Sequence, residues 1–595
     1  MPNAVTEPDL GLESRTLGAR VFWGVFALIF AAQCGLALLQ IGDDMVRGHN
    51  GWNSAAYQLS ARNSLRWDLL FPVQYDAGLT RPTPDQAYTH APLGLHAHTT
   101  LSVWLFGDSP AAVRAPSALY SILVLLMLVA FVKRHYSRMH ALIAGAVYVA
   151  LPINAIYLNM VNHQAGGLFW CLVSAYAYLE YREARYGDGR EQMRSSRRWL
   201  LATGAAFFFA SWWEYFANYL GLGIAVHWFF SSIARRGDAG AWWRPPGRDL
   251  GPFVLWCIYV PGLVFAHFAL VHWYVGSLDE LAHTASNRAD VSWSQFWGHL
   301  GSVPGIVFGW STLAMAGLWL LSWPYRWLRG RGRDADVLAL SLGFGGVLHY
   351  VVFKSSAIVH SYWGWVLLPT VSIALACWVV GLGTRIMSFA SGRGWGRRQS
   401  VAAVGLSALL LLPLAIRSAT LVPGAREVGG SLWFVAPVRG PVWEVYQSGR
   451  TEMRLANQIR EWTDRETGVL VHRSIEQTTP EPRFYTALDR YHRAVQNVPS
   501  IVPTDPSVSG GWVFVAASSA LPTDTWNRLA AEYAYKQFGD YIVIDFREEG
   551  PRVEIWDLEE AEPSFVRAFL VSPFETRLEP VRQPAAEAGL LRRLE

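Results

Sequence analysis

Acidic, amide and histidine side chains are crowded into one polar stretch, residues 42–114, between two hydrophobic segments. The stretch opens with Asp43 and Asp44, carries a Tyr-Thr-His-Ala-Pro motif around His90, and ends with Phe-Gly-Asp-Ser-Pro around Asp108. A carboxylate can take a proton from a hydroxyl group as a general base, and a neutral imidazole can bind a divalent metal. The plainer interpretation of the two acids is the solvated end of an apolar helix. Residues 42–114 are therefore the first candidate for chemistry.

Three further polar clusters interrupt apolar sequence. They are residues 159–164 around His163, a Trp-Trp-Glu-Tyr-Phe turn around Glu214, and a His-Ser-Tyr-Trp run that begins at His360. An ionisable group in an apolar hairpin is costly unless it meets water or a partner. Glu214 is accordingly a candidate catalytic acid or base, or else part of a turn among lipid headgroups.

Two basic residues stand near these clusters. Arg288 is in the connection 275–303, and Lys354 precedes His360. A cation at such a position either anchors the chain to lipid headgroups or holds a phosphate group. Both interpretations stay open at this stage.

His90, His96 and His98 lie within nine residues of one another. Imidazole is a common ligand for zinc and similar ions. No fixed ligand spacing accompanies the three residues, so their positions alone leave metal binding as one alternative among others.

The composition indicates a membrane protein. Hydrophobic residues make up 52% of the 595 residues and charged residues only 16%, against about 25% charged residues in soluble domains. The net charge of +4 gives no reason to expect a nucleic-acid partner. Cys34, Cys171, Cys257 and Cys377 all lie in hydrophobic segments, which predicts no disulfide framework.

Apolar runs long enough to cross a bilayer recur along the chain and predict about eleven transmembrane helices. We place them at residues 21–41, 115–132, 141–158, 165–181, 199–213, 216–232, 252–274, 304–324, 336–353, 361–382 and 400–421. The first run is long and follows an acidic N-terminal segment, so we interpret it as a retained helix rather than a cleaved signal.

Arginine and lysine gather in every second connection between these runs. The positive-inside rule then predicts a cytoplasmic N-terminal segment, residues 1–20, and places 42–114 outside the membrane. An odd number of crossings also places the C-terminus outside. We expect a multi-pass protein of the bacterial inner or plasma membrane.

The composition becomes that of a soluble domain beyond the transmembrane region, residues 21–425. Residues 455–463 and 524–535 predict helices, and residues 468–471 and 512–516 predict strands. Residues 541–546 and 553–556 predict a strand pair across a turn. The sequence thus predicts an extracytoplasmic α/β domain over 426–595.

Several weak motifs, taken in order, resemble the GT-C fold glycosyltransferases that use polyprenyl-phosphate sugars, a group that contains the protein O-mannosyltransferases of family 39 and the aminoarabinose transferases. The polar stretch resembles their catalytic first loop: an acid after the first helix, an interfacial helix over 53–63, and Phe-Gly followed by Arg114. Residues 152–164 and 352–369 resemble two later segments of the group. The resemblance covers about residues 20–380.

The resemblance implies inverting transfer of a sugar, by single displacement, from a polyprenyl-phosphate donor to a lipid, glycan or protein acceptor at the extracytoplasmic face. It implies Asp44, then Asp43, as the base, with Glu214 as a third catalytic candidate. Its other expected site residues bind substrate: His49, Asn53, Arg62, His163, Arg288, Lys354, His360 and Tyr362. A divalent metal at His90 is the one cofactor implied, and membrane lipids are expected partners.

The chain departs from the group at several motif positions. Gln164 stands where the group has Glu, Ser361 where it has Asp, and His49-Asn50 near the place of an Asp-Glu pair. Two other classes of function therefore stay open. One is a transporter or flippase of lipid-linked sugars, which predicts midplane acids and repeat symmetry that the sequence does not show. The other is a catalytically inactive GT-C-like assembly protein.

Overall fold

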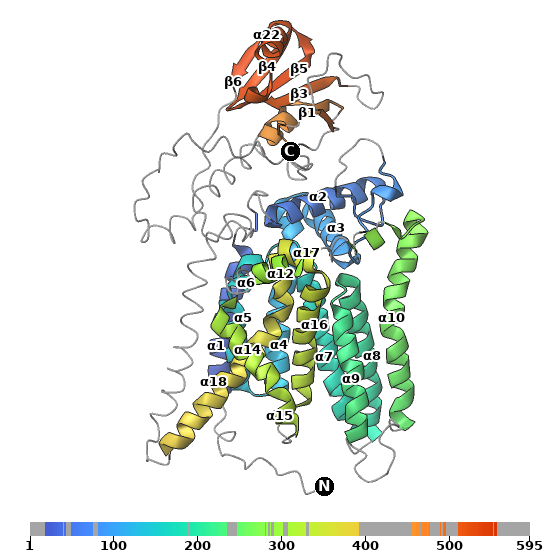
Figure 1. The fold of residues 1–595 in the computed structure, drawn as a ribbon, viewed down its shortest axis with the longest axis vertical. Coiled ribbons are helices and arrows are strands. Elements are labelled where there is room, and N and C mark those ends of the chain that lie inside the picture. Colours follow the sequence, from blue (N-terminus) through green and yellow to red (C-terminus); the bar gives the residue numbers. More distant parts are fainter. Residues whose placement is uncertain are drawn as a thin grey trace. The chain divides into compact units, whose positions relative to one another are not determined.

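The computed structural model describes residues 18–39, 41–42, 49–74, 81–186, 190–234, 247–279, 281–283, 286, 291–300, 308–328, 333–391, 455–464, 466–472, 474–475, 488, 492–495, 510–550 and 552–555. The helical part comes first and the strands come last in the chain (Figure 1). Each part is described by itself below.

The first helices build the region around the polar stretch. Their bounds are α1 Ala19–Leu38, α2 His49–Trp67, η2 Pro84–Gln86, α3 Gly94–Phe106, α4 Pro110–His135, α5 Arg138–Ala150 and α6 Pro152–Tyr157. Serine caps start two of them: the Ser109 side chain accepts from the backbone N–H of Ala112 in α4, and Ser137 accepts from that of His140 in α5. Such caps satisfy N–H groups that the helix itself leaves without a partner.

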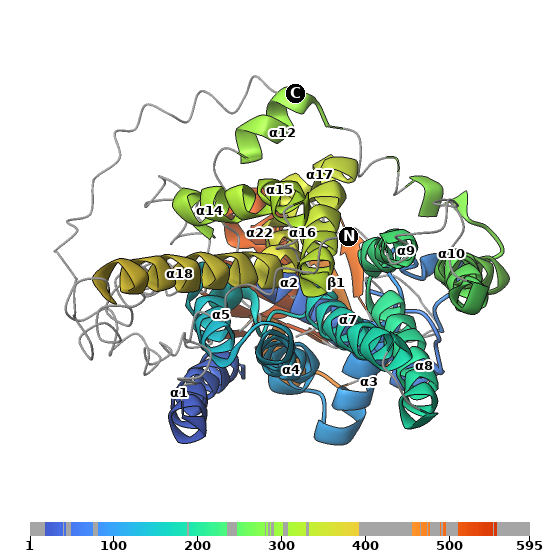
Figure 2. The same ribbon diagram turned by 90° about the horizontal axis from the view of Figure 1, so that it is seen from below.

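The remaining helices complete the bundle. They are α7 Gln164–Tyr186, α8 Arg190–Trp213, α9 Ala217–Ala234, α10 Gly247–Val275, α12 Trp293–Leu300, α14 Trp310–Leu321, α15 Trp323–Leu328, α16 Asp334–Val352, α17 Lys354–Val359, η3 Ser361–Leu367 and α18 Leu368–Ser391. The long helices stand side by side, and α2 lies across one end of them (Figures 1 and 2). We call this the α2 end of the bundle.

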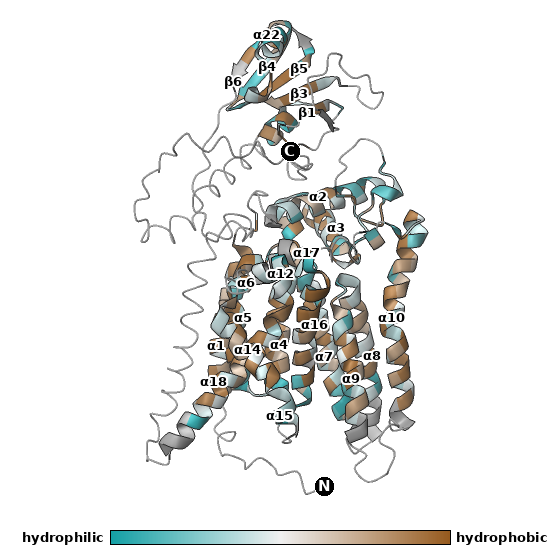
Figure 3. Cartoon of the chain, viewed as in Figure 1, coloured by the Kyte–Doolittle hydropathy of each residue, from teal (hydrophilic) through white to brown (hydrophobic). Residues whose placement is uncertain are grey.

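Apolar residues run along the length of helices such as α10 and α16 (Figure 3). Among the described residues, five helices are long and apolar enough to cross a membrane: 19–38, 110–135, 250–275, 334–352 and 362–385. Each predicted span up to residue 382 overlaps at least one helix, but the count of eleven is not confirmed. The last predicted span, 400–421, lies outside the described residues.

Close helix packing depends on glycine in several places. A Cβ atom at Gly343 of α16 would lie 2.7 Å from a methyl carbon of Thr370 in α18, and one at Gly221 of α9 would lie 2.6 Å from the ring of Phe207 in α8. Small residues allow membrane helices to approach closely. α16, which leads into α17 and η3, therefore packs closely on α18 at Gly343.

The segment predicted as an amphipathic interfacial helix, 53–63, lies within α2, which extends beyond it at both ends. Polar and apolar side chains alike are buried between Asn53 and Ser64. Several of the polar side chains bond to other segments of the chain, such as Asn53 to Val161, Tyr57 to His163 and Asn63 to Val73.

The C-terminal strands form one mixed sheet in the order β2-β1-β3-β5-β4-β6. The strands are β1 Gly468–His472, β2 His492–Val495, β3 Trp512–Ala517, β4 Tyr533–Phe538, β5 Tyr541–Glu549 and β6 Val553–Ile555. β1 pairs in parallel with both β2 and β3, and β5 runs antiparallel to β3 and β4. The helix over 455–462 and α22, Thr523–Glu532, complete the described part.

Two predictions for this domain are wrong in detail. The helix expected to reach residue 535 ends at Glu532, because the aromatic-rich run Tyr533–Phe538 pairs with β5 as a strand. The strand over 553–555 pairs in parallel with β4 rather than with β5 across the turn. The α/β character of the domain is confirmed.

Candidate functional site

Asn53 and Tyr57 stand one helical turn apart on α2 and both point to the segment before α7. The Asn53 side-chain amide donates to the carbonyl oxygen of Val161 at 3.0 Å. The Tyr57 hydroxyl lies 2.6 Å from His163 Nε2. Side chains four residues apart share one helix face, so this face of α2 is fixed against the 159–163 loop.

The second contact of His163 determines its tautomer. Its Nδ1 lies 3.1 Å from the carbonyl oxygen of Trp213. Because a carbonyl oxygen only accepts hydrogen bonds, Nδ1 donates, and in the neutral imidazole Nε2 then accepts from the Tyr57 hydroxyl. Three segments that are far apart in the sequence thus meet at one imidazole.

Glu214 is the first residue after α8, next to the carbonyl group that His163 contacts. It is 8% exposed, and its Oε1 accepts from the backbone N–H of Tyr215 at 2.9 Å. A Cβ atom at Gly167 of α7 would lie 3.1 Å from the Glu214 Cβ. The turn is therefore pressed against α7, which explains why an acid at this place is buried.

The Trp213 side chain, at the end of α8, also holds the turn that contains Glu214 in place. A Cβ atom at Gly94 of α3 would lie 2.8 Å from the indole ring of Trp213, and a Cβ atom at Gly166 of α7 would overlap that ring. The ring of Trp213 also lies 4.6 Å from that of Tyr120. The absence of side chains at Gly94 and Gly166 makes room for the indole.

Asparagine side chains hold the 159–163 loop. Asn162 donates to the carbonyl oxygen of Met160 at 2.9 Å and accepts from the backbone N–H of Ala165 at 3.2 Å, as a cap of α7. Asn159 donates to the carbonyl oxygen of Leu39, beyond α1, at 2.8 Å. Buried polar groups bonded in this way define a single loop conformation.

Sequence reasoning missed the role of Arg114, which it treated only as part of a motif. Arg114 is 2% exposed; its Nε donates to Ser54 Oγ at 3.2 Å and its Nη1 to the carbonyl oxygen of Ile41 at 3.1 Å. It therefore connects α4 to α2 and to the chain that follows α1. A basic residue one turn into an apolar helix was the available signal.

Arg62, a predicted substrate-binding residue, pairs with a carboxylate of the protein. Its Nε lies 2.6 Å from Asp108 Oδ2, and Gln58 Nε2 donates to Asp108 Oδ1 at 2.5 Å. Arg62 is buried, and Asp108 is about one third exposed. The pair joins α2 to the connection between α3 and α4.

We expect Asp108→Asn to lower the free energy of unfolding by about 1–2 kcal/mol, because the variant keeps the shape but loses two charge-assisted hydrogen bonds at a partly exposed site. The midpoint of thermal unfolding in detergent measures this loss. Asp85→Asn, in the exposed turn η2, is the matched control. Equal midpoints for the two variants would contradict the structural role of Asp108.

The three histidines considered as metal ligands have other partners. His96 Nε2 lies 2.9 Å from Ser64 Oγ, and His98 Nδ1 donates to the carbonyl oxygen of Gly94 at 2.7 Å. Burial, with a smaller effect of the nearby His163, lowers the pKa of His96 to about 3, and burial also lowers the pKa of His98. The ring of His90 lies 4.8 Å from that of Tyr88. Within the described ranges, no group of three or more His, Cys, Asp or Glu residues could hold a metal ion.

Three residues expected to bind substrate follow α16: Lys354 begins α17, His360 lies between α17 and η3, and Tyr362 is in η3. The ring of Tyr362 lies 6.0 Å from that of Tyr157 in α6, the helix that leads into the 159–163 loop, and 5.2 Å from the ring of His360. Tyr362 and His360 are therefore connected to the His163 region through α6. Lys354 is not part of this connection: its Nζ lies 4.2 Å above the ring of Trp293.

Some predicted site residues lie outside the described part of the chain. Asp43, Asp44 and Arg288 belong to this group, and of His49 only the backbone, at the start of α2, is described. The structure thus brings together Asn53, His163 and Glu214 of the predicted set, adds Tyr57, and connects Tyr362 and His360 through α6. Arg62 instead pairs with Asp108, and Lys354 lies over the ring of Trp293.

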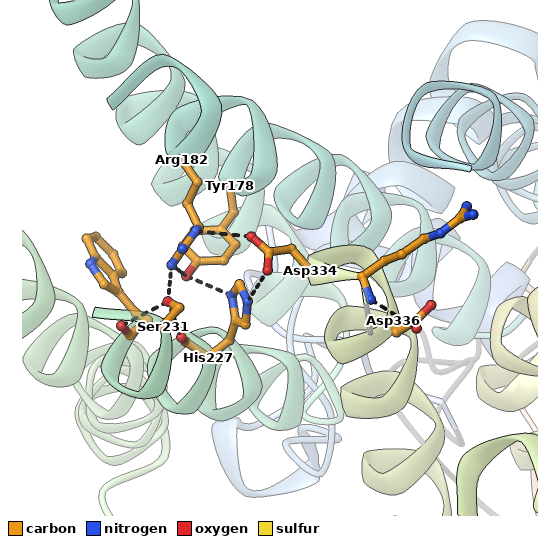
Figure 4. A network of polar contacts seen from close by, with 8 residues as sticks. Tyr178, Arg182, His227, Ser231, Asp334 and Asp336 are labelled. Atoms are coloured by element: carbon orange, nitrogen blue, oxygen red, sulfur yellow. Dashed lines mark hydrogen bonds and ion pairs between the residues drawn. The ribbon is translucent and has the colours of Figure 1, made fainter. Parts of the chain in front are cut away.

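A second buried polar cluster lies at the opposite end of the bundle from α2, where α7 and α9 end and α16 begins (Figure 4). Asp334 Oδ2 lies 3.7 Å from Arg182 Nε, and its Oδ1 lies 3.4 Å from His227 Nε2. Arg182 also donates to Ser231, and His227 Nδ1 lies 3.1 Å from the Tyr178 hydroxyl. This cluster fixes the first turn of α16.

The sequence matches the family model for dolichyl-phosphate-mannose-protein mannosyltransferase over residues 90–240, which is less than half of the chain but includes His163 and Glu214. No protein of curated function matches the chain by sequence.

Solved structures match over a longer part of the chain. The archaeal oligosaccharyltransferase AglB from Archaeoglobus fulgidus, in complex with an inhibitory peptide and a dolichol-phosphate, is 12% identical, with a TM-score of 0.52 over 79% of this chain and 64% of that chain. ArnT from Cupriavidus metallidurans, bound to undecaprenyl phosphate, is 15% identical, with a TM-score of 0.51 over 88% of this chain and 98% of that chain. The Archaeoglobus fulgidus oligosaccharyltransferase in complex with Zn and sulfate is 12% identical, with a TM-score of 0.50 over 79% of this chain and 62% of that chain.

This chain spans less than two thirds of the length of those two archaeal chains. At such low identities the likeness concerns the fold. The chain is a helical membrane protein with the GT-C fold and a small C-terminal sheet domain, and the resemblance to polyprenyl-phosphate-dependent GT-C proteins that the sequence predicted is confirmed.

Proposed function

We propose that this GT-C chain is a membrane glycosyltransferase that moves a sugar from a polyprenyl-phosphate donor to an acceptor by inverting single displacement. The observation that carries the proposal is that Tyr57, His163 and the Trp213 carbonyl group, which directly precedes Glu214, meet at the α2 end of the bundle. Polar groups that are buried and mutually bonded at the end of membrane helices indicate a functional site.

The reaction needs a carboxylate as base. The acceptor hydroxyl attacks the anomeric carbon, a new carbon–oxygen bond forms, and the bond between that carbon and the phosphate oxygen breaks. The hydroxyl proton passes to a carboxylate in the same step. We assign this role to Asp44, with Asp43 next and Glu214 third, because Glu214 already accepts a hydrogen bond from the Tyr215 N–H.

The departing polyprenyl phosphate gains negative charge, which positive groups or hydrogen-bond donors stabilise. We assign His360 and Tyr362 to this side, since α6 connects them to His163. Asn53 and His49 on α2 complete the substrate-binding surface, and Arg288 is a further cation for the phosphate group. Arg62 acts through its Asp108 pair, which holds α2 in place.

A divalent metal at His90 is part of the sequence-based hypothesis. The described residues around His90 do not supply a set of three ligands, so no step of the proposed reaction depends on a metal. The acceptor is a lipid, glycan or protein at the extracytoplasmic face of a bacterial inner membrane, in keeping with the predicted topology.

Turnover of the purified, detergent-solubilised chain tests the proposal. The assay offers a panel of polyprenyl-phosphate sugars with acceptor candidates and follows the release of free polyprenyl phosphate, with and without a chelator. Sugar-dependent release supports a transferase, and its sensitivity to the chelator tests the metal at His90. Donors that bind without any release would instead favour an inactive GT-C-like protein or a transporter.

We expect Tyr57→Phe to lower kcat/KM for the donor about tenfold, because His163 Nε2 loses the hydroxyl that donates to it, at a cost of about 1–2 kcal/mol. The initial rate at low donor concentration measures the effect. Tyr148→Phe is the matched control, since it removes a hydroxyl that bonds to the Ser121 carbonyl oxygen inside the bundle. The same loss in both variants would assign Tyr57 to general packing.

A further inference from the structure

The short helix α12, Trp293–Leu300, has side-chain caps at its N-terminus that stabilise its first turn. Ser292 Oγ accepts from the backbone N–H of Gln295 at 3.3 Å, and Gln295 Oε1 accepts from the backbone N–H of Ser292 at 3.3 Å. This reciprocal arrangement is a capping box. Helices of this length are marginal in water without packing, so one face of α12 requires an apolar environment.

The two faces of α12 differ sharply. Phe296 is buried, whereas Trp293 is 50% exposed and Trp297 is 60% exposed. The exposed rings stack on one another, with centroids 6.2 Å apart. A pair of exposed indole rings on a capped helix is typical of a segment that lies in the interface between headgroups and acyl chains.

Other exposed tryptophans also lie near helix ends. Trp273, 74% exposed, lies near the end of α10, and Trp310, 56% exposed, begins α14. α10 ends, and α12 lies, at the α2 end of the bundle (Figure 1). Tryptophan gathers at membrane–water interfaces because its ring is apolar and its N–H group is polar. α12 is therefore at headgroup level.

Lys354, at the start of α17, supplies a positive charge on this surface. Its Nζ lies 4.2 Å from the centre of the Trp293 ring, a distance at which the ring stabilises an ammonium group. α12 and α17 pack on one another, and α12 lies on the outside of the bundle beyond α17 (Figure 2). The charge and the indole pair thus belong to one outward surface.

We propose that Trp293, Trp297 and Lys354 form an interfacial anchor that binds the phosphate headgroup of an anionic phospholipid of the bilayer. The two indole rings lie among the headgroups, and the Lys354 ammonium pairs with a lipid phosphate. This assignment goes beyond glycosyl transfer, because Lys354 then binds the phosphate of a bilayer lipid rather than that of the sugar donor. Because α17 leads directly into His360, the anchor fixes the height of η3 relative to the membrane surface.

Hydrogen–deuterium exchange of the α12 backbone tests the anchor on the full chain without any turnover. The chain is placed in maltoside micelles, in nanodiscs of phosphatidylcholine, and in nanodiscs of phosphatidylcholine with phosphatidylglycerol. We expect slower exchange in both nanodiscs than in micelles, and the slowest exchange with phosphatidylglycerol. Lys354→Gln should raise the exchange rate in the anionic nanodisc about fivefold.

Three comparisons decide the proposal. Trp293→Ala combined with Trp297→Ala should remove the protection by bilayers, whereas Trp104→Ala, at a 67% exposed position on α3, should leave it unchanged. Equal exchange in micelles and nanodiscs would overturn the anchor. Protection that requires added undecaprenyl phosphate in phosphatidylcholine nanodiscs would also overturn it, by assigning the surface to the donor. Since none of these readouts depends on catalysis, failure of the proposed function leaves the test intact.

Discussion

Asp44→Asn is expected to lower the turnover number for glycosyl transfer by about 10²–10⁴-fold, the usual contribution of a general base. The amide keeps the size of the carboxylate but does not take the proton of the acceptor hydroxyl. The loss should fall on kcat rather than on donor binding, because the base acts on the acceptor only as the new bond forms. Single-turnover release of polyprenyl phosphate, with donor affinity measured separately, distinguishes the two effects.

Asp43→Asn is the matched control for Asp44→Asn, since it removes the same charge one residue earlier. A large loss at position 43 with a small one at 44 would exchange the two roles. Glu214→Gln covers the third candidate: the side chain is 8% exposed and lies next to the carbonyl group that His163 contacts. Full activity of both aspartate variants combined with an inactive Glu214→Gln would assign the base to the α8–α9 turn.

Asp334→Ala is expected to lower the free energy of unfolding by about 3 kcal/mol, because it deprives a buried guanidinium of this carboxylate. Arg182 is 3% exposed, whereas Asp334 is 45% exposed, so the cost falls on the arginine side (Figure 4). Thermal unfolding in detergent should show a fall in Tm of about 2–3 °C. Asp334 is at the first turn of α16, whereas the end of α16 that leads to His360 is the far end of the same helix.

Glu183→Ala is the matched control, because Glu183 pairs with Arg134 at an exposed site. Surface pairs contribute about 0–1 kcal/mol, so this variant should unfold close to the original temperature. Arg182→Met combined with Asp334→Ala should be more stable than Asp334→Ala alone, since the buried charge is then absent as well. Additive losses in the double variant would show that the two residues act independently.

The helical fold was largely predictable because the length of an apolar run reports directly on a membrane span. Predicted spans overlap α1, α4, α7 and α16, and the turn at Glu214 stands where the sequence placed it. The end of α22 was not predictable: the run from Tyr533 becomes a strand because β5 supplies its pairing partner, which local sequence does not specify.

Some residues of the candidate site could be predicted from the sequence, but the contacts between them could not. His163 and Glu214 stood out as polar residues in apolar surroundings, and His163 contacts the carbonyl oxygen of Trp213, the residue before Glu214. Tyr57 did not stand out, because a tyrosine on a helix is ordinary until its partner is known. Arg62 was expected to bind substrate, but it forms an ion pair with Asp108, 46 residues away in the sequence, which local sequence does not reveal.

The indole of Trp213, held against Gly94 and Gly166, has a consequence for biosynthesis. A chain made from its N-terminus completes α3 and α7 before Trp213 exists. Until the α8–α9 hairpin inserts, the surface over both glycines is bare and His163 lacks the carbonyl group that fixes its tautomer. His163 therefore gains this contact only after the α8–α9 hairpin has entered the bilayer beside the helices made earlier.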